Sequence, residues 1–235
     1  MIKRLTKVRL PDEYQRVEYL ESSGTQWIGT GITQNSVNTK IYCKFSYSKK
    51  SPGYIYGANT GLNCGYNSNQ TVDTLRVSGV ISNISIVLDE IYEVENYIID
   101  GYRYFAVNKG SVSQAAKTTI VENEIMLFRM SGQTGTIPIP ESRIFDFKIF
   151  EGDNIVLYYV PSVRKSDNKP GMYDLVSGQF FTNQGTGEFI VGEDINDPIE
   201  VWHTVKSVKR IVGGTMKDIH TIKRVVGGEV KTITI

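Results

Sequence analysis

Residues 143–150 read Arg-Ile-Phe-Asp-Phe-Lys-Ile-Phe, and this stretch decides the fold class. Its alternation predicts a β-strand with one entirely apolar face, as a sandwich core requires, made of Phe145, Phe147 and Ile149. A turn-forming Glu-Gly-Asp-Asn segment follows, and residues 155–160 form a second β-rich run that ends at Pro161. Residues 143–160 are therefore predicted to form a β-hairpin.

The same alternation extends outward along the chain. Residues 38–48 place four apolar positions on one predicted face, Ile41, Cys43, Phe45 and Tyr47. The dipeptide Asp100-Gly101 is a strong signal for a tight hairpin turn between two further strands. No segment has sustained helical periodicity. The sequence therefore predicts an all-β protein built from antiparallel strands.

Three segments carry a resemblance to a known family. Residues 10–32 include Leu-Pro-Asp-Glu-Tyr, residues 171–178 read Gly-Met-Tyr-Asp-Leu-Val-Ser-Gly, and residues 181–187 read Phe-Thr-Asn-Gln-Gly-Thr-Gly. With these motifs the chain resembles laminin-G-like and concanavalin A-like jelly-roll domains. The closest version is found in phage structural proteins (tail fibre, head fibre, decoration) and in gut bacterial surface proteins. The resemblance spans residues 10 to about 192 and implies a fold and a broad habitat, but no particular chemistry. We expect a two-sheet antiparallel jelly roll over residues 1–192.

Composition narrows the remaining function classes. The 235 residues carry a formal net charge of +1, so no overall basic field favours nucleic acid as a partner. No apolar stretch approaches the length of a membrane-spanning helix, and the N-terminus lacks the apolar core of a signal peptide. We therefore expect no membrane insertion, synthesis in a host cytoplasm, and localisation in a virion. Cys43 and Cys64 are expected to be buried free thiols, although their spacing also allows a disulfide.

The C-terminal part contains an internal repeat. Residues 193–200 are acidic and contain a proline, so we expect a linker there. Residues 208–219 and 222–233 then match at an offset of fourteen, each with a central Gly-Gly that suits a tight hairpin turn. Isolated hairpins are marginal in water, so residues 201–235 are predicted to dock on a partner, either other virion proteins or a homo-oligomer. The alternative is that both hairpins fold back onto the sandwich of the same chain. The candidate assembly residues are Val208, Ile211, Val212, Ile222, Val225 and Val226.

Catalysis has few candidate residues. Glu93 and Glu95, together with Asp89 and Glu90, are the one acidic cluster that could serve a glycoside hydrolase of concanavalin-like fold, but a solvated strand face explains them better. His203 and His220 occupy similar positions in the tail, so we expect no catalytic residues. No cofactor or metal is predicted. Calcium is possible without support from a motif, with the candidate ligands Asp153, Asn154, Asp167 and Asn168.

A binding function remains. Residues 54–66 are rich in tyrosine, asparagine and glycine, which suits a sugar site and is equally typical of an ordinary hairpin. The candidate carbohydrate contacts are Tyr54, Tyr56, Asn59, Asn63 and Tyr66. We expect a non-enzymatic virion protein, a fibre, tail or capsid-decoration component that adheres to a host-surface glycan. A bacterial surface carbohydrate-binding module is the main alternative.

Overall fold

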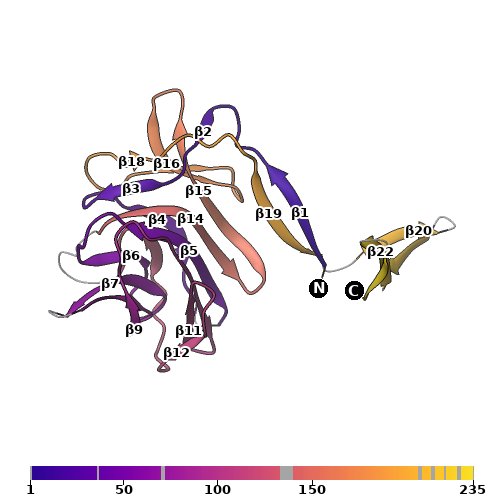
Figure 1. Ribbon diagram of the computed structural model, residues 1–235, viewed down its shortest axis with the longest axis horizontal. Coiled ribbons are helices and arrows are strands. Elements are labelled where there is room, and N and C mark those ends of the chain that lie inside the picture. The colour runs from indigo at the N-terminus through magenta and orange to yellow at the C-terminus, as the bar shows by residue number, and fades with distance from the viewer. Residues whose placement is uncertain are drawn as a thin grey trace. The chain divides into compact units, whose positions relative to one another are not determined.

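In the computed structural model the chain is all-β, and its described part has no helix (Figure 1). It describes the backbone except at residues 1, 36, 70–71, 133–139, 206–207, 213–214, 220, 227–228 and 235. Side chains are described within residues 7–35, 37–67, 73–132 and 140–201. The chain separates into two compact units, Leu10–Ile195 and a second made of Met1–Arg9 with Asn196–Ile235.

Leu10–Ile195 is a jelly-roll-like sandwich of two sheets, in which every pair of named strands is antiparallel. The larger sheet has eleven strands, and eight of them follow the order β12-β11-β10-β5-β14-β15-β16-β17, while β2, β3 and β18 pair alongside. Its strands are β2 (Tyr14–Arg16), β3 (Leu20–Ser23), β5 (Thr39–Tyr47), β10 (Tyr92–Ile99), β11 (Tyr102–Val107), β12 (Ser113–Ala115), β14 (Glu141–Glu151), β15 (Asn154–Arg164), β16 (Lys169–Asp174), β17 (Phe180–Thr182) and β18 (Ile190–Val191).

The smaller sheet has six strands in the order β4-β13-β6-β7-β8-β9. They are β4 (Ile28–Thr33), β6 (Gly53–Gly57), β7 (Asn63–Asn69), β8 (Val72–Val77), β9 (Val80–Ser85) and β13 (Glu124–Leu127). The core lies between the two sheets, where the predicted face of β5 is buried together with residues of β6 and β7. Tyr56 of the smaller sheet meets Phe147 of the larger one with ring centroids 5.6 Å apart. These buried aromatic contacts hold the sheets face to face.

The predicted hairpin at residues 143–160 is confirmed as β14 and β15, but its face assignment is wrong near Phe145. Ile144 is fully buried, whereas Phe145 and Asp146 both lie on the half-buried side. The pairing of β14 with β5 shifts between Ile144 and Asp146, which is the signature of a β-bulge. One extra residue in the strand exchanges its faces at that point, so the apolar core positions are Ile144, Phe147 and Ile149.

The predicted end of the second strand at Pro161 is also wrong. β15 continues to Arg164, and Pro161 pairs with Met172 of β16. The Pro161 carbonyl accepts a hydrogen bond from the Val17 amide at 3.1 Å. In an extended strand the N–H and C=O of one residue face the same neighbour, so the missing donor of Pro161 affects that side and leaves the β16 ladder intact.

The Asp100-Gly101 turn is confirmed. It joins β10 to β11, with Ile99 paired to Tyr102. Both turn residues have positive φ, 49° at Asp100 and 79° at Gly101. Positive φ at both central residues is the requirement of the type I′ turn, which Asp-Gly satisfies at low cost.

The motifs that carry the family resemblance form turns that close the sandwich. The Asp174 carboxylate accepts bonds from the amides of Tyr158, Val176 and Ser177 at 2.8, 3.1 and 3.1 Å, and from the Ser177 hydroxyl at 2.6 Å. This buried carboxylate therefore ties the turn after β16 to β15.

The second motif joins the two ends of the sandwich unit. Asn183 Oδ1 accepts hydrogen bonds from the Trp27 amide at 3.1 Å and the Gly185 amide at 2.7 Å. A Cβ on Gly185 would lie 2.0 Å from the Thr25 carbonyl oxygen, so this close approach requires glycine. The N-terminal and C-terminal motifs thus occur together because they pack against each other.

The second unit is made of paired strands. β1 (Ile2–Val8) pairs with β19 (Ile199–Val205), so residues 1–9 belong to the same unit as the tail. The predicted domain boundaries had placed them in the sandwich, residues 1–192. The predicted linker is shorter than residues 193–200, because Asp194 bridges to Val17 within the sandwich and Ile199 begins β19.

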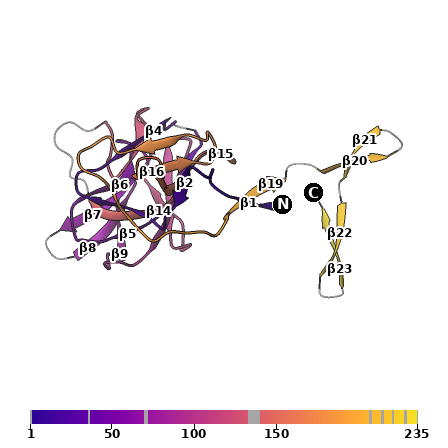
Figure 2. The same cartoon turned by 90° about the horizontal axis from the view of Figure 1, so that it is seen from above.

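Two hairpins complete the second unit. β20 (Val208–Val212) pairs with β21 (Thr215–Ile219), and β22 (Thr221–Val226) pairs with β23 (Glu229–Thr234) (Figure 2). The Gly-Gly turns predicted at residues 213–214 and 227–228 lie outside the described residues, although the strands pair on either side of them. Nowhere in the described part of the chain is a helix long and apolar enough to cross a membrane.

Candidate functional site

The outward side of the larger sheet carries a set of half-buried and buried aromatic residues. They alternate along β5, β10, β11, β14 and β15 with residues of the core. We call this surface the aromatic face and define it by Tyr42, Tyr97, Tyr104, Phe150 and Tyr158.

A stacked tyrosine pair forms one end of the aromatic face. Tyr97 of β10 and Tyr104 of β11 are register partners, and their ring centroids lie 5.3 Å apart with an interplanar angle of 15°. Gln114 of β12 donates a hydrogen bond to the Tyr104 hydroxyl at 3.1 Å. The pair therefore presents rigid aromatic surface beside hydrogen-bonding groups.

Lysines lie across the other rings of the aromatic face. Lys40 Nζ is 4.9 Å from the Phe150 ring centroid and 3.7 Å from a Glu95 carboxylate oxygen. Lys148 Nζ lies 4.8 Å from the Tyr42 centroid and 4.2 Å from the Tyr158 centroid. These cation–π contacts fix the lysines and leave the surface with both charge and aromatic character.

Asp146 is a half-buried charge of this face. Its Oδ2 pairs with Lys148 Nζ at 2.7 Å, while Oδ1 is buried without a hydrogen-bond partner among the described residues. Burial raises the pKa of Asp146 above its ordinary value, and the nearby Lys148 opposes that rise. Burial, followed by the Asp146 carboxylate, likewise raises the pKa of Tyr158.

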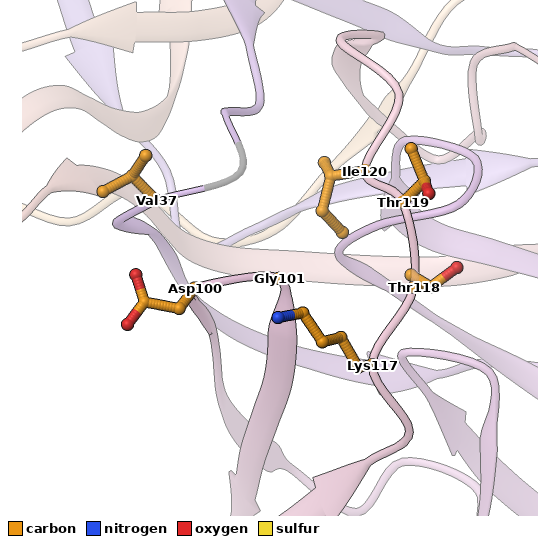
Figure 3. A pocket seen from close by; sticks show the side chains of 7 residues that line it. All are labelled: Val37, Asp100, Gly101, Lys117, Thr118, Thr119 and Ile120. Carbon is orange, nitrogen blue, oxygen red and sulfur yellow. The ribbon is translucent and has the colours of Figure 1, made fainter.

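An open hollow of about 690 Å³ lies at the β10–β11 turn (Figure 3). Val37 and Asp100 stand on one side of it, and the segment from Lys117 to Ile120 stands on the other. Lys117 Nζ is 5.2 Å from the Tyr102 ring centroid. The hollow therefore offers a carboxylate, an ammonium and two threonine hydroxyls beside exposed apolar surface.

A smaller hollow, of about 220 Å³, lies at the other end of the same two strands. It is lined by Tyr42, Glu93, Glu95, Ala106 and Lys109. The predicted acidic pair therefore borders a real depression, in which Glu93 lies 4.0 Å from Lys109 Nζ and Glu95 pairs with Lys40. Tyr97 follows Glu95 on the same side of β10, so the stacked tyrosines stand between the two hollows.

The structure buries two of the five predicted carbohydrate contacts at residues 54–66 and leaves the other three half-buried. Tyr56 is 0% exposed and Asn63 6% exposed, so both are core residues. Tyr66 packs edge-on against Tyr47 with centroids 5.8 Å apart, and Asn59 binds the Gly132 carbonyl. Tyr54 remains half-buried on β6. Tyr56 and Tyr66 therefore contribute to the packing of the sandwich core.

The four candidate calcium ligands do not converge. Asp153 and Asn154 lie at one end of β15, and Asp167 and Asn168 follow its other end. The strand has eleven residues, which corresponds to about 35 Å. Within the described part of the chain, no group of three or more His, Cys, Asp or Glu residues is placed to hold a metal ion.

The remaining predicted residues can be placed only in part. Cys43 and Cys64 are free and fully buried, as expected. The assembly candidates all lie in β20 and β22, and their side chains lie outside those described: Val208, Ile211, Val212, Ile222, Val225 and Val226. His203 is in β19, and His220 lies outside the described residues.

Comparison with family models and with curated proteins finds no match to this chain. The site is therefore interpreted from its own geometry. Sequence reasoning missed the stacked tyrosines, although a signal for them exists. If Asp100 and Gly101 form a two-residue turn, the strands on either side pair with Ile99 opposite Tyr102. The same register places Tyr97 opposite Tyr104.

Proposed function

We propose that this chain is a non-enzymatic structural component of a virion, a phage fibre, tail or capsid-decoration protein, whose sandwich adheres to a host-surface glycan. The virion assignment is supported by the family resemblance of residues 10–192 and by the repeated tail hairpins. The glycan assignment is supported by the aromatic face.

The stacked pair of Tyr97 and Tyr104 is the observation that carries the glycan proposal. Tyrosine rings offer apolar area to the C–H faces of a sugar at low entropic cost, and their hydroxyls bond to sugar hydroxyls. Polar groups at both ends of the pair, in the two hollows, would fix the orientation of a saccharide chain.

A glycan array followed by affinity measurements tests this proposal. Tyr97→Ala and Tyr104→Ala should each weaken binding of the selected glycan about tenfold or more, corresponding to about 1–3 kcal/mol for a buried aromatic anchor. Tyr54→Ala, on the smaller sheet, is the matched control and should bind as the wild type does. Equal affinity in all three variants would contradict the assignment of the aromatic face.

Electron microscopy and mass spectrometry of particles that contain this protein test the virion assignment. The protein should copurify with intact particles at a fixed stoichiometry. Recovery in a bacterial cell-surface fraction without particles would instead favour the alternative, a surface carbohydrate-binding module. The array result does not depend on this outcome, so the two parts of the proposal can fail separately.

A further inference from the structure

The net charge of +1 conceals a strong separation of charge between the two units. Met1–Arg9 and Asn196–Ile235 together carry eleven Lys and Arg residues against four Asp and Glu residues, a net charge of +7. Leu10–Ile195 carries fifteen against 21, a net charge of −6. The smaller unit is therefore strongly basic for its size, and the sandwich is acidic.

The tail hairpins place cations opposite cations. In β20–β21 the register pairs Arg210 with Lys217, and in β22–β23 it pairs Arg224 with Lys231. Like charges directly opposite each other on neighbouring strands destabilise a hairpin. The same arrangement recurs at the fourteen-residue repeat, so both hairpins have a cost that a negatively charged partner would offset.

The sandwich offers a matching acidic patch, which we define as Asp12, Glu13, Glu18, Glu193 and Asp194. All five residues are exposed. The Glu18 amide donates to the Glu193 carbonyl at 2.8 Å, and Asp194 bridges to Val17, so two distant parts of the chain meet there. Within the part of the chain that the structure describes, none of the five forms an ion pair. Arg16 and Lys165 lie beside the patch, which leaves it with an excess of negative charge.

We propose that the basic hairpins of one copy dock on the acidic patch of a second copy, so that the chain associates with itself through opposite charges. This inference rests on the proposed assembly role of the tail and names its partner. A second copy is favoured over nucleic acid because the chain itself supplies an anionic patch, on a sandwich whose net charge of −6 nearly balances the +7 of the smaller unit.

Sedimentation velocity of the full chain and of two charge-reversed variants tests the proposal. The wild type should associate in about 0.1 M salt and dissociate in about 1 M salt, where the Debye length falls from about 10 Å to about 3 Å. A tail variant, Lys217→Glu with Lys231→Glu, and a patch variant, Glu193→Lys with Asp194→Lys, should each associate about tenfold more weakly or worse.

Mixing the two variants is the decisive step. Each variant keeps one surface unaltered, so in an equimolar mixture the basic hairpins of the patch variant can dock on the acidic patch of the tail variant, and the mixture should associate again. The control variant, Glu151→Lys with Asp153→Lys, reverses two exposed acids at the β14–β15 turn and should behave as the wild type does. Unchanged thermal unfolding in all variants shows that the fold is intact.

Three outcomes would overturn the inference. The first is a wild type that stays monomeric in low salt, and the second is association that neither charge reversal weakens. The third is a mixture of the two variants that stays monomeric, which is the result expected if each tail docks on its own chain. A monomer whose hairpins bind single-stranded DNA or heparin would assign them to a foreign polyanion. Glycan binding by the aromatic face is measured separately and is unaffected by any of these results.

Discussion

The Ser78 hydroxyl donates a 2.7 Å hydrogen bond to Asn96 Oδ1, and this bond crosses the apolar core from one sheet to the other. Both residues are 0% exposed. The amide of Asn96 also donates to the Asn63 carbonyl at 3.2 Å. A buried polar network of this kind stabilises the sandwich only while all its members are satisfied.

We expect Asn96→Ala to lower the free energy of unfolding by about 2–4 kcal/mol, because it leaves a cavity and removes the hydrogen-bond partner of the buried Ser78 hydroxyl. Urea denaturation followed by tyrosine and tryptophan fluorescence measures the change. Asn83→Ala, an exposed asparagine on β9, should change stability by less than about 0.5 kcal/mol. Equal effects of the two substitutions would contradict the structural role of Asn96.

Asp174→Ala should be among the most destabilising changes in the sandwich. It removes one carboxylate that accepts four hydrogen bonds, and it leaves the buried Tyr158 amide without its acceptor. We expect a loss of about 3 kcal/mol or more. Asp153→Ala, in the exposed β14–β15 turn, is the matched control, and thermal unfolding compares the two.

The two thiols should react only when the sandwich opens. Burial raises the pKa of both Cys43 and Cys64, and neither side chain is exposed. A thiol reagent should therefore label two cysteines in denaturant without reductant and neither in the native protein. Fast native labelling would show that the core opens locally, and absence of labelling in denaturant would reveal a disulfide.

Tyr66 gives a prediction in the alkaline range. Burial, reinforced by a hydrogen bond to Asp73, raises the pKa of Tyr66 from 10.0 to about 12. The folded state therefore holds the phenol proton more tightly than the unfolded state, and the free energy of unfolding falls as pH rises from 10.0 to about 12. Tyr66→Phe should make this fall less steep, whereas Asn83→Ala, an exposed substitution on β9, should leave it as in the wild type. Denaturant titrations across that pH range decide the point.

Hydrolase activity is not expected from the acidic pair. Glu93→Gln combined with Glu95→Gln should change stability by less than about 1 kcal/mol, because the ion pairs to Lys109 and Lys40 are at the surface. Release of reducing sugar from bacterial polysaccharides measures the activity. Activity in the wild type that disappears in this double variant would establish a glycoside hydrolase and overturn the proposal of a binding protein.

Local sequence patterns predicted the strands and turns well, but they predicted poorly which strands pair with each other. The Asp100-Gly101 turn and the β5 face follow from residue types alone, because turn dihedrals and burial act locally. The bulge at Phe145 could not be predicted from alternation, because an extra residue is detected only against the neighbouring strand. The pairing of β1 with β19, almost 200 positions away, depends on contacts that no local pattern encodes.

The same difficulty affected the candidate site. Tyr56 and Tyr97 are similar in sequence context, each within a strand rich in aromatic and β-branched residues. One is in the core and the other on the outward side, since the strand register decides which face is buried. Composition could therefore predict that tyrosines are abundant in the strands, but not which of them lie on the outward side of the sheet.

The pairing of β1 with β19 makes the sandwich an insertion within a smaller β unit. The chain enters the sandwich after Arg9 and leaves it before Asn196, and Arg9 donates a 3.1 Å hydrogen bond to the Asn196 carbonyl. The two chain segments that connect the units therefore lie next to each other. An unrelated domain whose own termini lie close together could replace the sandwich between these two junctions without interrupting the smaller, basic unit. The sandwich and the smaller unit could then evolve independently, since recombination at two short junctions replaces one and keeps the other.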